Sequence, residues 1–246
     1  MLAFGSTEQD VDCRHAEVSR RGILSVVASR TIVFADLAGF TAATDVHGDD
    51  VALDLATRFC EITRENLGPN DVFVKSIGDA VMCTAPDPAA GIALVQAIVG
   101  RLTAERGFPD VRVGLHHGSV LERNGDVFGA AVNLAARVAA HAGASQVLTT
   151  TEVAAVAREI GVTVTDLGEV EFRNVAEPWR IFELGMGCRD CGFAVDPVCK
   201  MRVERVSAAA RVRHGGIDWC FCSLDCVARF ATDPGRYAIP TQPSNP

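Results

Sequence analysis

Three short segments of this 246-residue chain place polar side chains in otherwise apolar surroundings. They are TIVFADLAGFT at 31–41, KSIGDAVM at 75–82 and GDVFGAAVNLAAR at 125–137. Their chemically distinctive members are Asp36, Lys75, Asp79, Asp126, Asn133 and Arg137. Carboxylates, an amide and cations in this combination suit a reaction at a phosphate group that is assisted by divalent metal ions.

The two carboxylates Asp36 and Asp79 are the candidate metal ligands. Each lies at the end or start of a predicted strand and close to a glycine, where backbone can approach phosphate closely. Hard divalent cations such as Mg²⁺ or Mn²⁺ prefer carboxylate oxygens. A single aspartate of this kind is also common in turns and caps, so the interpretation depends on the pair.

Asn133 and Arg137 are four residues apart in a predicted helix, so both side chains project from one face. Arg137 could donate to negative charge that develops on a phosphoryl group, and Asn133 could orient a ribose. The alternative is an ordinary solvated helix face. The remaining residues of this helix are mostly Ala, Val and Leu, which is a poor composition for such a face.

Lys75 is one of only two lysines, with Lys200, among 23 basic residues. A lysine in an apolar strand suggests that a compact, single-point hydrogen-bond donor is needed there. N1 of adenine is an acceptor that fits such a donor. Asp126 could accept from the exocyclic amino group of the same base. Guanine presents O6 and a protonated N1 instead, and the pair would match that edge badly.

The elements that position these residues follow from hydrophobic periodicity and from Gly and Pro signals. The expected order is a strand at 31–37, a helix at 50–66, two strands within 71–86, a helix of about 16 residues from Pro88, a strand at 111–123 and a helix at 129–141. This is an α+β, ferredoxin-like βαββαβ core, an antiparallel sheet with helices on one face. Further strands are expected at 146–150, 162–168 and 179–184.

The region from about 31 to 184 resembles a class III nucleotidyl cyclase catalytic domain, on the strength of FADLAGFT, KSIGDAV and DVFGAAVNLAAR. The resemblance implies an adenylate cyclase that converts ATP to 3′,5′-cyclic AMP and pyrophosphate, with two Mg²⁺ or Mn²⁺ ions per active site. It also implies a head-to-tail homodimer in which the metals of one subunit face residues of the other. It assigns metal binding to Asp36 and Asp79, adenine selection to Lys75 and Asp126, and transition-state roles to Asn133 and Arg137.

Two alternatives to an adenylate cyclase stay open. One is a guanylate cyclase on the same fold, which differs in the residues that select the base. The other is a metal-responsive regulatory protein whose cyclase domain has lost turnover.

Six of the nine cysteines crowd the last 60 residues. The segments DPVCKM at 196–201 and WCFCSLDCVARF at 219–230 resemble the YHS and TRASH families of small, treble-clef-like metal modules. The resemblance predicts Cys199, Cys222 and Cys226 as ligands, with zinc the first expectation and copper(I) the second. The fourth ligand is expected from Cys188, Cys191, Cys220 or His214. Lys200 stands where these families usually have glycine.

Three units are therefore expected: a possibly flexible lead at 1–30, a catalytic domain at 31–185 and a Cys-rich module at 186–240. The net charge of −8 argues against a broad nucleic-acid surface. No apolar stretch approaches the roughly 20 residues of a membrane span, and residues 1–30 do not resemble a secretory signal. A cytoplasmic protein is expected, with Cys13, Cys60, Cys83, His116 and His117 as structural residues.

Overall fold

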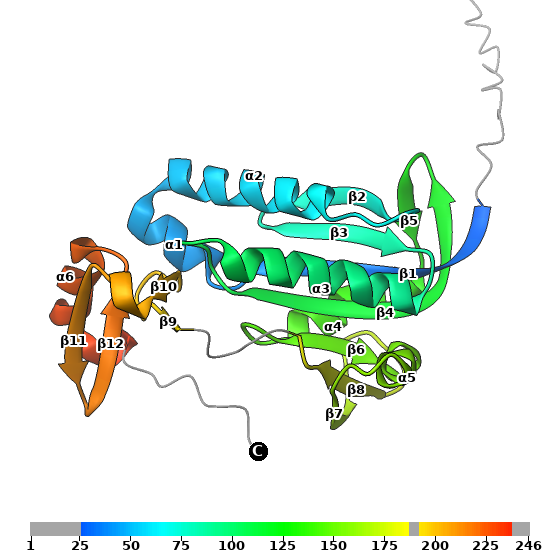
Figure 1. Ribbon diagram of the computed structural model, residues 1–246. Coiled ribbons are helices and arrows are strands. Elements are labelled where there is room, and N and C mark those ends of the chain that lie inside the picture. The colour runs from blue at the N-terminus through cyan, green and yellow to red at the C-terminus, as the bar shows by residue number, and fades with distance from the viewer. Residues whose placement is uncertain (1–25, 187–191, 238–246) are drawn as a thin grey trace, which may run out of the picture.

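The computed structural model describes residues 26–186 and 192–237. The first range forms one large sheet with helices on both faces, and the second forms a small module at one end of it (Figure 1). The strands of the large sheet lie in the order β2 (Val72–Ile77), β3 (Ala80–Ala85), β1 (Val26–Leu37), β4 (Val111–Arg123), β6 (Val147–Thr150), β8 (Trp179–Leu184) and β7 (Val164–Val170), and β5 (Asp126–Phe128) pairs with β4.

The four strands of the predicted βαββαβ core, β1 to β4, pair antiparallel, as expected. The extended sheet is mixed. Strands β4 and β6 are parallel, and the other neighbouring pairs are antiparallel. A parallel pair needs a crossover, which is supplied by helix α4 (Ala130–His141) between β5 and β6. The predicted strands themselves are confirmed, including the three beyond the βαββαβ core.

Two helical layers cover the sheet. Helices α2 (Asp49–Glu65), α3 (Pro88–Ala104) and α5 (Thr151–Glu159) pack on the face formed by Val33, Ala35 and Leu37 of β1. Helix α4 packs on the opposite face, over Ile32. The two helices of the predicted core, α2 and α3, therefore lie on one face as expected, whereas the further predicted helix α4 lies on the other face. Helix α5 and a short helix at Phe40–His47 were not predicted.

Two glycines of β4 bring α4 unusually close to the sheet. A Cβ at Gly114 would lie 2.2 Å from the backbone nitrogen of Ala139, and one at Gly118 would lie 2.9 Å from the Cβ of Ala131. Because nothing larger than glycine fits at these positions, the helix lies flat on the strand. The position of α4 fixes where Asn133 and Arg137 stand.

Strand β1 begins at Val26, earlier than the expected start at residue 31. Its first residues pair with the far end of β4, where Val27 is opposite Leu121 and the Arg30 guanidinium bonds Glu122 over 2.7 Å. This pairing extends the strand into the predicted lead. Residues 1–25 of that lead lie outside the described part of the chain.

The C-terminal module consists of two short hairpins and two helices. Its elements are β9 (Phe193–Val195), β10 (Arg202–Glu204), the 3₁₀ turn at Arg205–Ser207, β11 (Ala210–His214), β12 (Ile217–Phe221), α6 (Leu224–Thr232) and α7 (Pro234–Tyr237). Lys200, in the turn between β9 and β10, has a φ of 64°, so lysine adopts the left-handed conformation that glycine would take more readily.

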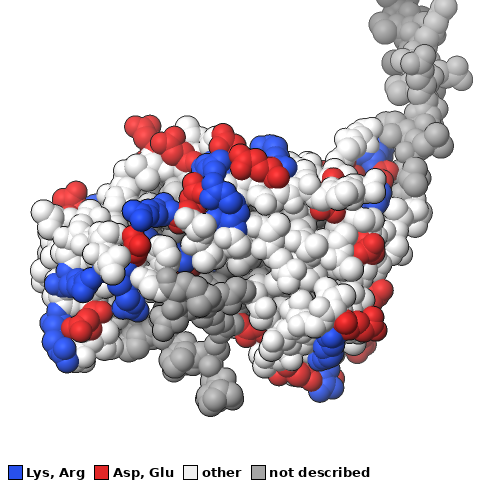
Figure 2. Space-filling view, viewed as in Figure 1, with Lys and Arg blue, Asp and Glu red and all other residues white. Residues whose placement is uncertain are grey.

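Basic and acidic side chains are interspersed on the face of the molecule in Figure 2. Mixed signs of this kind produce no extended single-sign potential across that face. Within the described ranges, no helix is both long and apolar enough to cross a membrane.

Candidate functional site

Asp36 and Asp79 come together at one end of the central strands. Asp36 lies near the end of β1, Asp79 in the β2–β3 hairpin, and the backbone nitrogen of Leu37 donates to the carbonyl of Asp79 over 3.3 Å. Burial, and next the nearby charge of Asp36, raise the pKa of the Asp79 carboxyl. Two carboxylates that repel each other in this way are a suitable donor set for a hard divalent cation.

Arg112 is a third member of this group, which the sequence analysis did not identify. It lies opposite Asp36 in the register of β1 and β4, and its Nε donates to the Oδ2 of Asp36 over 2.6 Å. The guanidinium partly offsets the charge of the two aspartates. Arg112 is opposite Asp36 in this register of β1 and β4. The sequence alone does not define that register, so it could not predict the contact.

Lys75 and Asp126 form a direct ion pair. Lys75 is on β2 and Asp126 begins β5, and the Lys75 Nζ lies 2.9 and 2.7 Å from the two carboxylate oxygens. The Lys75 ammonium holds the pKa of the Asp126 carboxyl below its usual range. A positive donor and a negative acceptor are thus fixed side by side, 51 residues apart in sequence.

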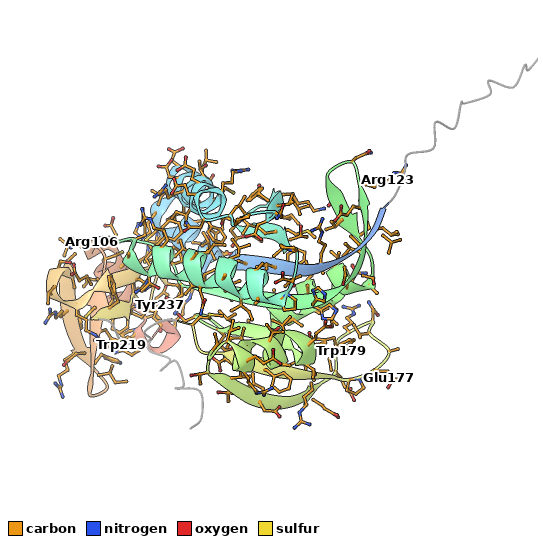
Figure 3. All side chains as sticks on the ribbon, turned by 45° about the vertical axis from the view of Figure 1, so that its right-hand side comes forward. Arg106, Arg123, Glu177, Trp179, Trp219 and Tyr237 are labelled. Carbon is orange, nitrogen blue, oxygen red and sulfur yellow. The ribbon has the colours of Figure 1, made fainter. Side chains whose placement is uncertain are left out.

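Asn133 and Arg137 are exposed on α4, and each directly precedes a buried residue, Leu134 and Val138 respectively. Asn133 also borders a cavity of about 490 Å³ whose lining includes His116 and Trp179, the latter labelled in Figure 3. Among the described residues, neither side chain makes a hydrogen bond or ion pair within the chain. Both are therefore available to a ligand.

His116 and His117 point to different neighbours, as alternation along a strand predicts. The His116 ring bonds the Thr150 hydroxyl over 2.8 Å, and His117 bonds Ser29 and Thr31. They share no ligand position. Their contacts agree with the structural role expected for them.

The six predicted residues fall into three groups within one chain. Asp36 lies with Asp79, Lys75 lies with Asp126, and Asn133 and Arg137 share α4. No hydrogen bond or ion pair joins one group to another within residues 26–186 and 192–237.

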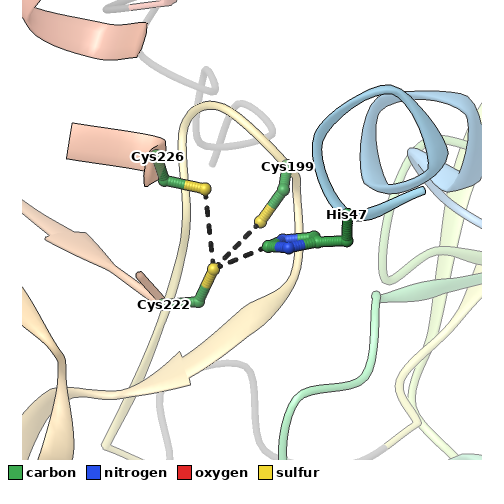
Figure 4. A group of neighbouring side chains, drawn as sticks. All are labelled: His47, Cys199, Cys222 and Cys226. Carbon is green, nitrogen blue, oxygen red and sulfur yellow. Dashed lines mark hydrogen bonds between the residues drawn. The ribbon is translucent and has the colours of Figure 1, made fainter. Parts of the chain in front are cut away.

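A second group of ligand-type side chains lies where the C-terminal module contacts the sheet domain. The Sγ of Cys222 lies 3.4 Å from the Sγ of Cys199, 3.6 Å from the Sγ of Cys226 and 3.6 Å from the Nε2 of His47 (Figure 4). The four ligand atoms are all within 4.8 Å of one another. The three predicted cysteines therefore come together, and the fourth member is His47.

Among the described residues, the expected sources of a fourth ligand, Cys220 and His214, are not in this group. Cys220 lines a separate cavity, and the His214 ring packs edge-on against Phe230. Cys188 and Cys191 lie outside the described residues. His47 ends helix α1 (Phe40–His47), far from the cysteines in sequence, and no spacing rule could have linked it to them.

The three thiols share their protons unequally. The hydrogen bond with Cys199 lowers the pKa of the Cys222 thiol to about 6 and raises that of Cys199. Burial raises the pKa of Cys226 to about 12. Cys222 consequently carries the first negative charge in the group. Two other described cysteines lie away from this group: Cys83 is buried in the core of the sheet domain, and Cys60 packs against that core.

Sequence comparison relates the chain to curated adenylate cyclases. It is 40% identical over 108 residues to a pH-sensitive adenylate cyclase of Mycobacterium tuberculosis, a match that covers 44% of this chain and 27% of that protein. An adenylate cyclase of Streptomyces coelicolor is 35% identical over 120 residues, or 48% of this chain and 31% of that protein. The chain thus spans less than a third of the length of either relative.

Solved structures show the same fold. The adenylyl cyclase CyaB from P. aeruginosa aligns with a TM-score of 0.57 at 19% identity, over 69% of this chain and 100% of that one. A Trypanosoma brucei adenylate cyclase aligns with a TM-score of 0.58 at 22% identity, over 64% and 88%. The family model of the adenylate and guanylate cyclase catalytic domain matches residues 26–183. The chain therefore belongs to the adenylate and guanylate cyclase catalytic domain family.

Proposed function

We propose that this protein is an adenylate cyclase, which converts ATP to 3′,5′-cyclic AMP and pyrophosphate. The observation that carries the proposal is the ion pair of Lys75 and Asp126, on the same sheet as the paired carboxylates Asp36 and Asp79. The first pair suits recognition of adenine and the second suits divalent metal ions. The adenylate cyclases among its relatives support the same substrate.

Adenine presents an acceptor at N1 next to a donor at its exocyclic amino group. In the proposed complex the Lys75 ammonium donates to N1 and the Asp126 carboxylate accepts from the amino group. The ion pair holds the two side chains in place before the base arrives, so little side-chain entropy is lost on binding. Guanine would face Lys75 with a protonated N1 and Asp126 with O6, which leaves two mismatched partners.

Asp36 and Asp79 would hold two divalent cations, Mg²⁺ or Mn²⁺. When bound, such ions neutralise the triphosphate and lower the pKa of the attacking hydroxyl. Arg112 occupies the Oδ2 of Asp36 in this structure, so its side chain must give way there when a cation is held. Until then it reduces the repulsion between the two carboxylates.

The reaction forms a bond between the ribose 3′-oxygen and the α-phosphorus and breaks the bond from that phosphorus to the oxygen that bridges to the β-phosphate. The hydroxyl proton leaves to solvent and pyrophosphate departs. Asn133 would bond the ribose and hold its hydroxyl in line, and Arg137 would donate to the charge that grows on the α-phosphoryl oxygens. Both side chains are exposed and free for these contacts.

A head-to-tail homodimer would assemble the complete site. Within one chain, the carboxylate pair makes no direct bond to the adenine pair or to α4 among the described residues. A two-fold dimer brings the carboxylates of one subunit to Lys75, Asp126, Asn133 and Arg137 of the other, and produces two equivalent sites. Specific activity should then rise with protein concentration until the dimer is saturated.

The proposal is tested by measuring the cyclic nucleotide that the purified chain forms from ATP and, separately, from GTP, with Mg²⁺ or Mn²⁺, across a dilution series. Cyclic AMP with specific activity that falls on dilution supports it. Cyclic GMP would show a guanylate cyclase instead. No product with either nucleotide and either metal would favour the regulatory alternative.

A further inference from the structure

The group of His47, Cys199, Cys222 and Cys226 has the shape of a four-coordinate metal site. Tetrahedral zinc has bonds of about 2.3 Å to sulfur and about 2.0 Å to nitrogen, which places two sulfurs about 3.8 Å apart and sulfur and nitrogen about 3.5 Å apart. The distances from the Cys222 Sγ are 3.4, 3.6 and 3.6 Å. Small side-chain movements would complete the tetrahedron.

The loops that carry the cysteines are held in place by one buried aspartate. Asp196 is fully buried, and its Oδ1 accepts from the backbone nitrogens of Val198 and Cys199. Its Oδ2 accepts from the backbone nitrogen of Cys222 over 2.8 Å. These bonds join the turn that carries Cys199 to the segment that carries Cys222, as outer partners commonly do around a metal centre.

The fourth donor belongs to the catalytic domain. His47 is the last residue of α1, and α1 begins at Phe40, directly after the segment Asp36–Gly39. The helix therefore connects the segment that carries a candidate ligand of the catalytic metals to a donor at the cysteine group. Figure 4 shows the His47 ring reaching across to Cys222 from this helix.

The module also touches the loop after Asp36 directly. A Cβ at Gly39 would lie 2.4 Å from the Cβ of Lys200, so the two backbones approach as closely as glycine allows. The main chain of Asp110 accepts from the backbone nitrogen of Ala38 over 2.7 Å. The Asp110 side chain lies 3.5 Å from the Nε of Arg202, whose side chain is only 10% exposed.

Other contacts seat the module against the same end of the domain. The backbone nitrogen of Arg202 donates to the carbonyl of Phe108 over 2.9 Å. Arg106 follows the end of α3 and is labelled in Figure 3; its guanidinium nitrogen lies 3.2 Å from a carboxylate oxygen of Glu204. Val198, Met201 and Phe230 belong to the same buried hydrophobic cluster as Leu37 and Phe59 of the sheet domain.

We propose that one Zn²⁺ ion binds His47, Cys199, Cys222 and Cys226 and fastens the C-terminal module to helix α1, next to the catalytic carboxylates. Three thiolates and one imidazole in a tetrahedron are a preferred zinc environment. The site belongs to neither unit alone. Zinc occupancy thereby controls how firmly α1 and the loop at Asp36 are held. The effect of zinc on turnover rests on the proposed cyclase activity, whereas the binding of zinc is independent of that activity.

The first test is the zinc content of the full chain, purified and kept under reducing conditions, measured by mass spectrometry of the metal. The expected result is one zinc per chain. His47→Ala should lower zinc affinity by at least roughly 100-fold, because loss of an outer partner alone costs roughly 10- to 100-fold. His214→Ala is the matched control, since that histidine lies in the module but outside the group, and it should keep one zinc.

Substitution with Co²⁺ shows whether His47 is itself a ligand. His47→Cys should still bind the ion, with a stronger thiolate-to-cobalt charge-transfer band, whereas His47→Ala should alter the visible spectrum of tetrahedral Co²⁺. Identical affinity and identical spectra in the wild-type and His47→Ala chains would overturn the proposal. So would a reduced wild-type chain that takes up no zinc, or one that binds copper(I) without zinc.

Hydrogen exchange of helix α1 tests whether the ion joins the two units. Removal of zinc from the wild-type chain should speed exchange of the amides in Phe40–His47, and readdition should restore protection. In His47→Ala, zinc should leave that exchange unchanged. Equal protection of α1 with and without zinc in the wild-type chain would contradict the fastening role, whether or not the protein makes cyclic AMP.

If the proposed cyclase activity is present, His47→Ala should lower it in excess Mg²⁺ while His214→Ala does not. An unchanged rate together with zinc-dependent protection of α1 would limit the ion to a structural role and overturn its control of the catalytic loop. Absence of cyclic AMP from the wild-type chain would contradict the proposed function and leave the zinc measurements to be judged alone.

Discussion

Arg112 faces Asp36 across the β1–β4 ladder and donates from its Nε to the Oδ2 of Asp36 over 2.6 Å. While no cation is bound, the contact reduces the repulsion between the carboxylates of Asp36 and Asp79. A partly exposed ion pair of this kind contributes little to folding, on the order of 1 kcal/mol or less. The role of Asp36 should therefore appear in turnover far more than in stability.

Asp36→Asn should reduce the formation of cyclic AMP by roughly 100- to 1,000-fold or more, because charge stabilisation by a metal ion amounts to several kcal/mol. The rate is measured with saturating ATP and Mn²⁺, and thermal unfolding is compared in parallel. Asp54→Asn, an exposed aspartate on α2, is the matched control and should keep the wild-type rate. A fully active Asp36→Asn chain would remove Asp36 from the metal site.

Lys75 and Asp126 should determine the choice of base. Replacing them together, as Lys75→Glu with Asp126→Cys, should lower kcat/KM for ATP and raise the ratio of GTP to ATP turnover, because the new side chains match guanine rather than adenine. Product from each nucleotide is measured separately. If the double variant keeps the ATP preference of the wild type, this pair does not select the base.

Protonation of His116 should make folding sensitive to acid. Burial, followed by the charge of neighbouring His117, lowers the pKa of His116 to about 4, whereas an unfolded histidine has a pKa near 6.5. Between these values the unfolded chain binds more protons, so stability is complete above about pH 6.5 and declines as the pH falls. At pH 5 the loss from this residue is about 2 kcal/mol.

Urea unfolding at pH 7.5 and pH 5 measures this loss. His116→Gln keeps a side chain able to bond Thr150 but cannot titrate, so its stability should decline by about 2 kcal/mol less over that range than the stability of the wild type. His141→Gln replaces an exposed histidine and should retain the wild-type slope. Equal slopes for the His116→Gln and wild-type chains would show that His116 is not buried in its neutral form.

Much of the fold and part of the site could be predicted because they depend on local patterns. The strand and helix order follows from periodicity, and the Asn133–Arg137 pair follows from helical spacing alone. The resemblance to small metal modules predicted Cys199, Cys222 and Cys226 as ligands of one metal, and the structure brings their three sulfurs together. That they bind a metal stays a prediction. The first two predictions depend on residues within single elements, and the third depends on a sequence pattern typical of small metal modules.

The remaining features depend on tertiary arrangement that local patterns do not encode. Arg112 meets Asp36 only through the register of two strands, and a shift of one residue would have turned it to the other face. His47 meets the cysteines only because the module packs against the end of α1. The parallel pairing of β4 and β6 likewise depends on the crossover through α4.

The most direct test of a shared active site is complementation between two inactive variants. Asp36→Ala removes a proposed metal ligand and Arg137→Ala removes the proposed transition-state donor, so each homodimer should be nearly inactive. In an equal mixture about half of the dimers are mixed, and each has one intact site, so activity should return to about a quarter of the wild-type value. Co-purification of two different tags shows whether mixed dimers form. If they form and produce no cyclic AMP although the wild type is active, the site is not shared between subunits.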